Sequence, residues 1–142
     1  MTSWSAPGSS VPTGRRKDSS VASNTGPREG FHTVTPRIVV PDVAAQVDFL
    51  RAVFGGTGDV HAGRPAEVLV GDSIVMVSPA TDRDRFPAFL YVYVDDADEV
   101  FRRAMDAGAE SMEAPVDVPY GDRRAMVRDP FGNIFQIAHQ RS

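Results

Sequence analysis

The chain has 142 residues, with 19 acidic and 15 basic side chains for a formal net charge of -4, and it contains no Cys. The lack of Cys excludes disulfides, thiolate-bound metals, iron–sulfur clusters and a Cys nucleophile. The acidic balance argues against nucleic acid as the main partner, and there is no run of about 18 apolar residues to cross a membrane. These features predict one ordinary domain whose partners are neither nucleic acid nor membrane.

Residues 1–30 differ in composition from the rest of the chain. They hold seven Ser, four Gly and three Pro, and their few apolar residues are too scattered to offset the entropy cost of ordering the segment. Arg15-Arg16 is followed by polar residues instead of the apolar stretch that a twin-arginine export signal needs. We therefore expect a disordered N-terminal tail, a cytoplasmic location, and a folded domain in residues 31–142.

The domain begins with a strand and a helix. The β-branched residues within 34–40, interrupted by Pro36, indicate a strand at the edge of a sheet. Asp42 is placed to cap a helix, in which apolar residues recur every three to four positions from Val43 to Phe54. The glycine pair that follows favours the end of this helix.

Three further strands are expected before residue 80. A short strand lies around residues 59–61. Residues 66–70 and 73–78 form a hairpin, because the two-residue turn Gly71-Asp72 joins them. The first half therefore reads strand, helix, strand, strand, strand.

The second half repeats this order. Asp96 is placed to cap its helix, and Glu99 provides the second half of a capping box. Four strands are expected, at residues 88–94, 110–114, 123–128 and 133–139. A four-residue turn, 129–132, joins the last two. Two βαβββ halves define an α+β fold.

In this order of elements and in several short motifs, the chain resembles the vicinal oxygen chelate (VOC) superfamily, and within it the PhnB-like glyoxalase/bleomycin resistance protein/dioxygenase type. The motifs are Thr35-Pro36 with Val39-Val40-Pro41-Asp42, Asp48-Phe49-Leu50, Gly71-Asp72-Ser73 with Met76, Tyr91-Val92-Tyr93-Val94-Asp95-Asp96, Tyr120-Gly121-Asp122-Arg123, and Val127-Arg128-Asp129-Pro130-Phe131-Gly132. The resemblance implies two modules, about 33–78 and 88–139, that form a cupped mixed sheet with the helices on its convex side. It also implies a small ligand in the cup and a homodimer.

The resemblance further implies four inward positions that hold a divalent metal in the enzymes of the superfamily. In this chain these positions fall on Thr35, Met76, Phe89 and Gln136. Phe cannot ligate a metal, a thioether is a poor ligand for a hard ion, and Gln offers one neutral oxygen. The three His, at positions 32, 61 and 139, lie outside the set. We therefore predict no metal and no other cofactor.

Strand alternation predicts which other side chains line the cup. The two-residue turn pairs Glu67 with Met76, and the four-residue turn pairs Ala125 with Gln136, which places Arg123 on the same face. The predicted ligand-binding residues are Arg37, Glu67, Met76, Phe89, Tyr91, Tyr93, Arg123 and Gln136. Aromatic rings with a few fixed polar groups suit a planar ligand, although the same alternation is equally typical of an ordinary core, and Arg37 and Glu67 could simply pair with each other.

The leading hypothesis is a metal-independent binding protein that carries or sequesters an aromatic natural product or drug, as in antibiotic resistance. One alternative is a VOC-fold enzyme. It would be either a cofactor-free isomerase, epimerase or cyclase with Glu67 as base and Tyr91 as proton donor, or a metal-dependent lyase or dioxygenase whose ligands lie elsewhere. Another alternative is a regulatory domain that binds a partner through its tail.

Overall fold

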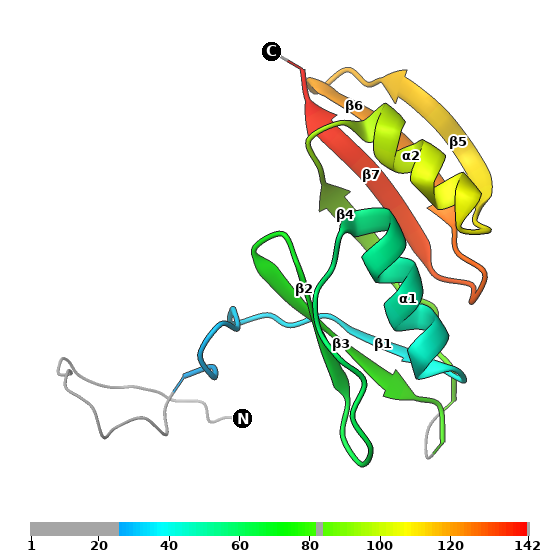
Figure 1. Ribbon diagram of the computed structural model, residues 1–142. Coiled ribbons are helices and arrows are strands. Elements are labelled where there is room, and N and C mark those ends of the chain that lie inside the picture. The colour runs from blue at the N-terminus through cyan, green and yellow to red at the C-terminus, as the bar shows by residue number, and fades with distance from the viewer. Residues whose placement is uncertain (1–25, 82–83, 142) are drawn as a thin grey trace, which may run out of the picture. The chain divides into compact units, whose positions relative to one another are not determined.

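The computed structural model describes residues 26–81 and 84–141. The chain divides into a compact unit of residues 34–142 and a separate unit of residues 1–33. Most of the expected disordered tail, residues 1–30, lies outside the described residues. The 34–142 unit has the α+β fold with two similar modules that the sequence predicts (Figure 1).

Each module consists of a sheet with one helix against it (Figure 1). The first module contains β1 (Arg37–Val40), α1 (Val43–Phe54), β2 (Ala66–Val70) and β3 (Ser73–Pro79), with strand order β1-β3-β2. The second contains β4 (Phe89–Tyr93), α2 (Ala97–Asp106), β5 (Glu110–Asp117), β6 (Asp122–Arg128) and β7 (Ile134–Gln140), with strand order β4-β7-β6-β5. The expected mixed sheet is thus present as two sheets, each hydrogen-bonded within its own module.

The two modules share one topology. In each, the first strand pairs in parallel with the last strand, and the last strand pairs antiparallel with the one before it. The first module lacks the strand expected at residues 59–61; a single bridge between Thr57 and Leu69 stands in its place. The strand expected at 110–114 is longer than predicted and extends to Asp117.

Both helices begin at a capping aspartate, and the first also ends at a glycine. The Asp42 carboxylate accepts a hydrogen bond from the Ala45 N–H at 3.0 Å, and α1 ends at Gly55, which has a φ of 69°. The Asp96 carboxylate accepts from the Asp98 and Glu99 N–H groups. The expected capping box is only half formed, because the Glu99 side chain pairs with Arg102.

The core lies between the helices and the sheets, and it continues from one module into the other. Phe135 of β7 is 1% exposed, and its ring packs on Phe49 and Phe54 of α1 with centroid separations of 5.9 and 5.3 Å. Helices α1 and α2 also contact each other. The opposite face of each sheet carries no helix, and we call it the open face.

A buried polar cluster also joins the modules. Gln46 of α1 donates to the Asp129 carboxylate at 2.9 Å and accepts from the Asn133 side-chain amide at 2.8 Å. Asn133 in turn accepts from the Ala88 N–H at the entry to β4. Gln46, Asp129 and Asn133 are all buried. This joint, which we call the Gln46 cluster, fixes the β6–β7 connection against the first helix.

Candidate functional site

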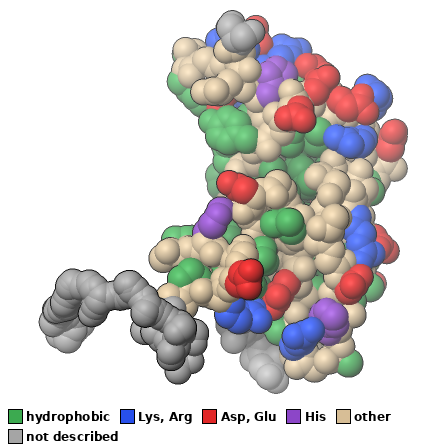
Figure 2. Space-filling view, turned by 60° about the vertical axis from the view of Figure 1, so that its left-hand side comes forward, with side chains coloured by type: hydrophobic (Ala, Val, Ile, Leu, Met, Phe, Trp, Pro, Cys, Tyr) green, Lys and Arg blue, Asp and Glu red, His purple; other side chains and the backbone are tan. Residues whose placement is uncertain are grey.

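The open face of the second module presents three aromatic side chains of one strand. Phe89, Tyr91 and Tyr93 alternate along β4 and are 66%, 37% and 63% exposed. The intervening Leu90 and Val92 pack against the core. Figure 2 shows hydrophobic side chains that reach the surface among the charged ones. The prediction that these three aromatic residues share a face is therefore correct, and we call them the aromatic strand.

Asp122 holds two of these rings in place. Its carboxylate Oδ2 accepts a hydrogen bond from the Tyr91 hydroxyl at 2.6 Å and from the Tyr93 hydroxyl at 2.9 Å. The two rings lie 5.3 Å apart. The Tyr120 hydroxyl lies 3.4 Å from that of Tyr91 and accepts from Arg124 at 2.9 Å. These contacts fix the orientation of the aromatic rings before any ligand arrives.

The Asp122 carboxylate keeps both phenols in their neutral form. Burial and then the hydrogen bond to Asp122 raise the pKa of Tyr91 far above its usual value near 10. The hydrogen bond to Asp122 likewise raises the pKa of Tyr93. At neutral pH both hydroxyls therefore stay protonated, and each donates a hydrogen bond to the Asp122 carboxylate. Both hydroxyl protons are thus engaged by Asp122, an arrangement that holds the rings in place and does not favour proton transfer to a substrate.

Tyrosine absorbance at alkaline pH is expected to report this cluster directly, because Tyr91, Tyr93 and Tyr120 are the only tyrosines of the chain. The folded protein binds the Tyr91 and Tyr93 protons more tightly than the unfolded chain. The contribution of these two raised pKa values to the free energy of unfolding is therefore fully present below pH ~10, and it is lost as the pH rises beyond that value. Asp122→Asn should shift phenolate formation, measured at 295 nm, to lower pH. An unchanged titration curve in the variant would contradict the assignment.

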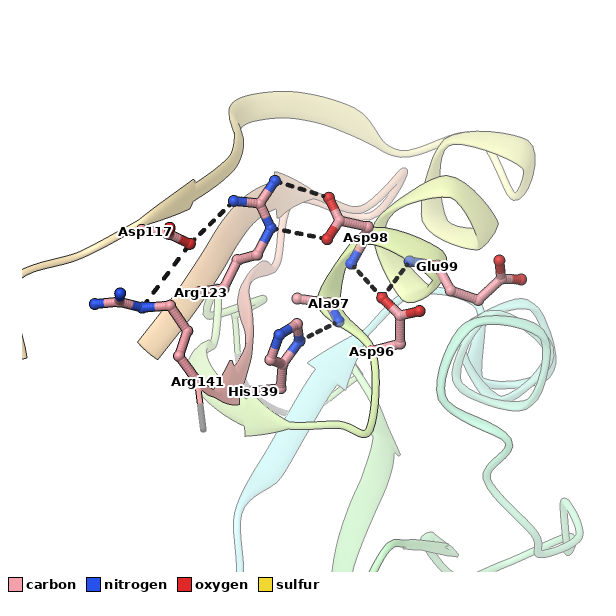
Figure 3. Close-up of polar contacts among 8 residues, drawn as sticks. All are labelled: Asp96, Ala97, Asp98, Glu99, Asp117, Arg123, His139 and Arg141. Carbon is pink, nitrogen blue, oxygen red and sulfur yellow. Dashed lines mark hydrogen bonds and ion pairs between the residues drawn. The ribbon is translucent and has the colours of Figure 1, made fainter. Parts of the chain in front are cut away.

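Arg123 does not lie on the open face. Its guanidinium binds the Asp98 carboxylate through Nε at 2.8 Å and Nη2 at 3.1 Å, and Asp117 through Nη1 at 3.0 Å (Figure 3). Asp98 belongs to α2, so Arg123 lies on the side that carries the helix. This ion pair holds the pKa of Asp98 below its usual value. The prediction that Arg123 lines a ligand site is therefore wrong.

The cause is the connection between β6 and β7. Asp129 pairs with Asn133 through a backbone hydrogen bond of 2.8 Å, so three residues form the turn where four were expected. Gly132 has a φ of 95°, which such three-residue loops need at their last position. Gln136 consequently pairs with Met126, one residue beyond Ala125. A shift of one residue reverses the face of every side chain on β6, so Asp122 and Arg124 occupy the open face.

The predicted residues of the first module lie on the other sheet. Glu67 pairs with Met76 as predicted, and Arg37 also pairs with Met76, with its Nη2 3.8 Å from the thioether sulfur. Phe89, Tyr91, Tyr93 and Gln136 belong to the second sheet. The predicted lining is thus divided between two sheets, with Glu67 on the first and Tyr91 on the second.

The four positions that the resemblance assigns to a metal are divided in the same way. Thr35 precedes β1 and Met76 lies in β3, whereas Phe89 pairs with Ile134 and Gln136 pairs with Tyr91 in the second sheet. Within residues 26–81 and 84–141, no three His, Asp or Glu side chains gather as metal ligands would. Phe89 has no donor atom and Met76 offers only a thioether, so these four side chains do not fit the metal of the superfamily's enzymes.

Sequence reasoning missed Tyr120, Asp122 and Arg124. The expected strand starts at residue 123 and leaves Asp122 outside it, but Asp122 is the first residue of β6 and only 3% exposed. A signal was nevertheless present. The motif that contains Tyr120 and Asp122 was one of those on which the resemblance was based.

Comparisons with known proteins agree with this fold. A family model described as Glyoxalase/Bleomycin resistance protein/Dioxygenase superfamily matches residues 30–137. The crystal structure of TioX from Micromonospora sp. ML1 superposes with a TM-score of 0.66 at 27% identity, over 75% of this chain and 96% of that one. A family member from Burkholderia phytofirmans PsJN superposes with a TM-score of 0.65 at 21% identity, over 75% and 96% of the two chains.

Two curated relatives are similar in sequence. An uncharacterized protein of Mycobacterium bovis is 30% identical over 122 residues, which cover 73% of this chain and 80% of the relative. The anthracycline biosynthesis protein DnrV of Streptomyces peucetius is 32% identical over 117 residues, which cover 68% of this chain and 42% of DnrV.

The fold is that of a two-module α+β protein whose second sheet carries fixed aromatic rings on its open face. The chain belongs to the Glyoxalase/Bleomycin resistance protein/Dioxygenase superfamily. None of the helices in the described part of the chain is long and apolar enough to cross a membrane.

Proposed function

We propose that the protein is a metal-independent, cytoplasmic binding protein that carries or sequesters a planar aromatic small molecule. The observation behind this proposal is the aromatic strand, in which Phe89, Tyr91 and Tyr93 expose their rings on one face. Asp122 orients two of the rings, so little rotamer entropy remains to be lost on binding. Aromatic pairs gain about 0.5–1.5 kcal/mol beyond their area burial, which favours a ligand with extended rings.

The contacts of the site favour binding over catalysis. The Tyr91 proton is engaged by Asp122, so this hydroxyl is not poised to protonate a substrate. Glu67, the base of the enzyme hypothesis, belongs to the other sheet. The similarity to DnrV, whose name assigns it to anthracycline biosynthesis, points to the chemical class of ligand, because anthracyclines are planar and polycyclic.

Binding of an anthracycline tests this proposal. Titration of the protein should quench anthracycline fluorescence, and Tyr91→Ala should weaken affinity by about 1–3 kcal/mol through lost stacking and apolar burial. Tyr91→Phe is the matched control, since it keeps the ring and removes only the hydroxyl, and it should bind almost as well as the wild type. Equal affinity of Tyr91→Ala and the wild type would contradict the proposed site.

We also propose that the protein forms a homodimer. A free sheet edge supports this: β4 pairs with only one strand, β7, within the described residues. A second copy could pair with that edge and leave the open face to the ligand. Sedimentation velocity at micromolar concentration should give a mass close to twice 15.4 kDa. A purely monomeric protein at that concentration would contradict this proposal without affecting the aromatic site.

A further inference from the structure

A cavity lies in the first module, and none of its lining residues belongs to the aromatic strand. It has a volume of about 420 Å³, within the usual range for small-molecule sites. Its lining includes two arginines, a histidine and a serine, which are Arg37, Arg64, His61 and Ser78. Arg37 begins β1, Ser78 lies near the end of β3, and His61 and Arg64 belong to the connection between α1 and β2. We call these four residues the basic cavity.

The charged side chains that line the basic cavity within the described residues are all basic. Elsewhere in the chain arginines bind carboxylates, as Arg51, Arg102, Arg123, Arg124 and Arg128 all do. By contrast, the structure records no hydrogen bond or ion pair for His61 or Arg64 within the described residues, and the one recorded there for the Arg37 guanidinium is to the Met76 sulfur. In a chain with a net charge of -4, such a cluster attracts an anion.

The Ser78 hydroxyl is an independent sign of a ligand. Ser78 is 9% exposed, and its Oγ is the one buried side-chain polar atom without a hydrogen-bond partner in the described part of the chain. Leaving a buried hydroxyl unpaired costs free energy, so native structures rarely retain one without a reason. A hydroxyl can donate to an oxyanion, and neighbouring guanidinium groups bind carboxylate and phosphate with paired N–H donors.

We propose that the basic cavity binds the oxyanion group, phosphate or carboxylate, of a small molecule. Arg37 and Arg64 supply the permanent charge, His61 adds a ring nitrogen as donor, and Ser78 donates its hydroxyl. The site lies on a different sheet from Tyr91, so it does not depend on the proposed aromatic site.

The test uses inorganic phosphate, phenyl phosphate and benzoate as probes of the full-length protein, with chloride to hold ionic strength constant. We expect at least one probe to raise the melting temperature and to give a measurable Kd by calorimetry. The double variant Arg37→Gln/Arg64→Gln should weaken that Kd at least tenfold, whereas Arg102→Gln, which removes one positive charge from α2, should leave it unchanged. The ranking of phenyl phosphate against benzoate then identifies which oxyanion the cavity prefers.

Ser78→Ala separates a binding role from a structural one. Because the hydroxyl has no partner, its removal should keep or raise the melting temperature of the ligand-free protein, while the Kd for the best probe weakens about fivefold. A melting temperature that none of the three probes raises above the chloride control would overturn the proposal. So would equal binding by the wild type and the double arginine variant. Tyr91→Ala should leave phosphate binding intact, so the failure of one site is distinguishable from the failure of the other.

Discussion

Gln46→Leu is expected to lower the free energy of unfolding by about 2–5 kcal/mol, although Leu fits the volume and suits a helix. The change removes the amide that donates to Asp129 and accepts from Asn133. Both partners stay buried, and each buried polar group that loses its hydrogen bond costs about 1–3 kcal/mol. Urea denaturation monitored by far-UV circular dichroism measures the loss.

Asp48→Asn on the same helix is the control. The Asp48 side chain is exposed and only loosely paired with Arg51 at 3.4 Å, so its replacement should change stability by no more than about 0.5 kcal/mol. The double variant Gln46→Leu/Asn133→Leu should cost less than the sum of the two single changes, because the lost hydrogen bond between them is counted only once. Simple additivity would show that the Gln46 cluster does not act as a unit.

Gly58→Ala is expected to destabilise the protein by about 3 kcal/mol, through two separate effects. Gly58 has a φ of 149°, which L residues rarely adopt. An added Cβ would also lie 2.2 Å from the Glu67 carbonyl oxygen, which is main chain and cannot rotate away. The strain of the backbone alone accounts for about 1–3 kcal/mol, and the clash forces the connection away from β2. Thermal unfolding of the variant measures the combined loss.

Gly71→Ala isolates the first of these effects. Gly71 also has a positive φ, 59°, but a Cβ there would meet no atom within 4 Å. We expect it to cost about 1 kcal/mol, clearly less than Gly58→Ala. Equal losses in the two variants would show that the close approach of Gly58 to β2 is unimportant.

The contrast between the two hairpins shows what local sequence can determine. In the first, Gly71-Asp72 admits only a tight two-residue turn, so the pairing of Glu67 with Met76 follows directly. In the second, four turn-forming residues were identified, but Asp129 pairs with Asn133 and belongs to the ladder. Because the turn is one residue shorter than predicted, the side chains of β6 lie on the opposite faces. Arg124 therefore occupies the open face, where Arg123 was expected.

Other features depended on partners far away in the sequence. Gln46 is a polar residue on the buried side of α1, and its two partners lie 83 and 87 positions further along the chain. Asp122 is buried because Tyr91 and Tyr93 donate to it from another strand. The pattern of apolar and polar residues along a short stretch of sequence carries no information about such distant pairs. Apart from the strand expected at residues 59–61, the order of elements could be predicted, as could the N-caps of both helices and the aromatic strand, because each of them depends on neighbours in the chain.

The contacts between the two modules also bear on how the domain unfolds. Phe135 packs on α1, and the Gln46 cluster ties the same helix to the β6–β7 connection. A fragment that stopped before β4 would expose Phe49, Phe54 and an unpaired Gln46 amide to water. Although the two halves repeat one topology, each depends on the other for part of its buried contacts. We therefore expect the two halves to unfold together, so that a change that loosens β7 also loosens the first helix.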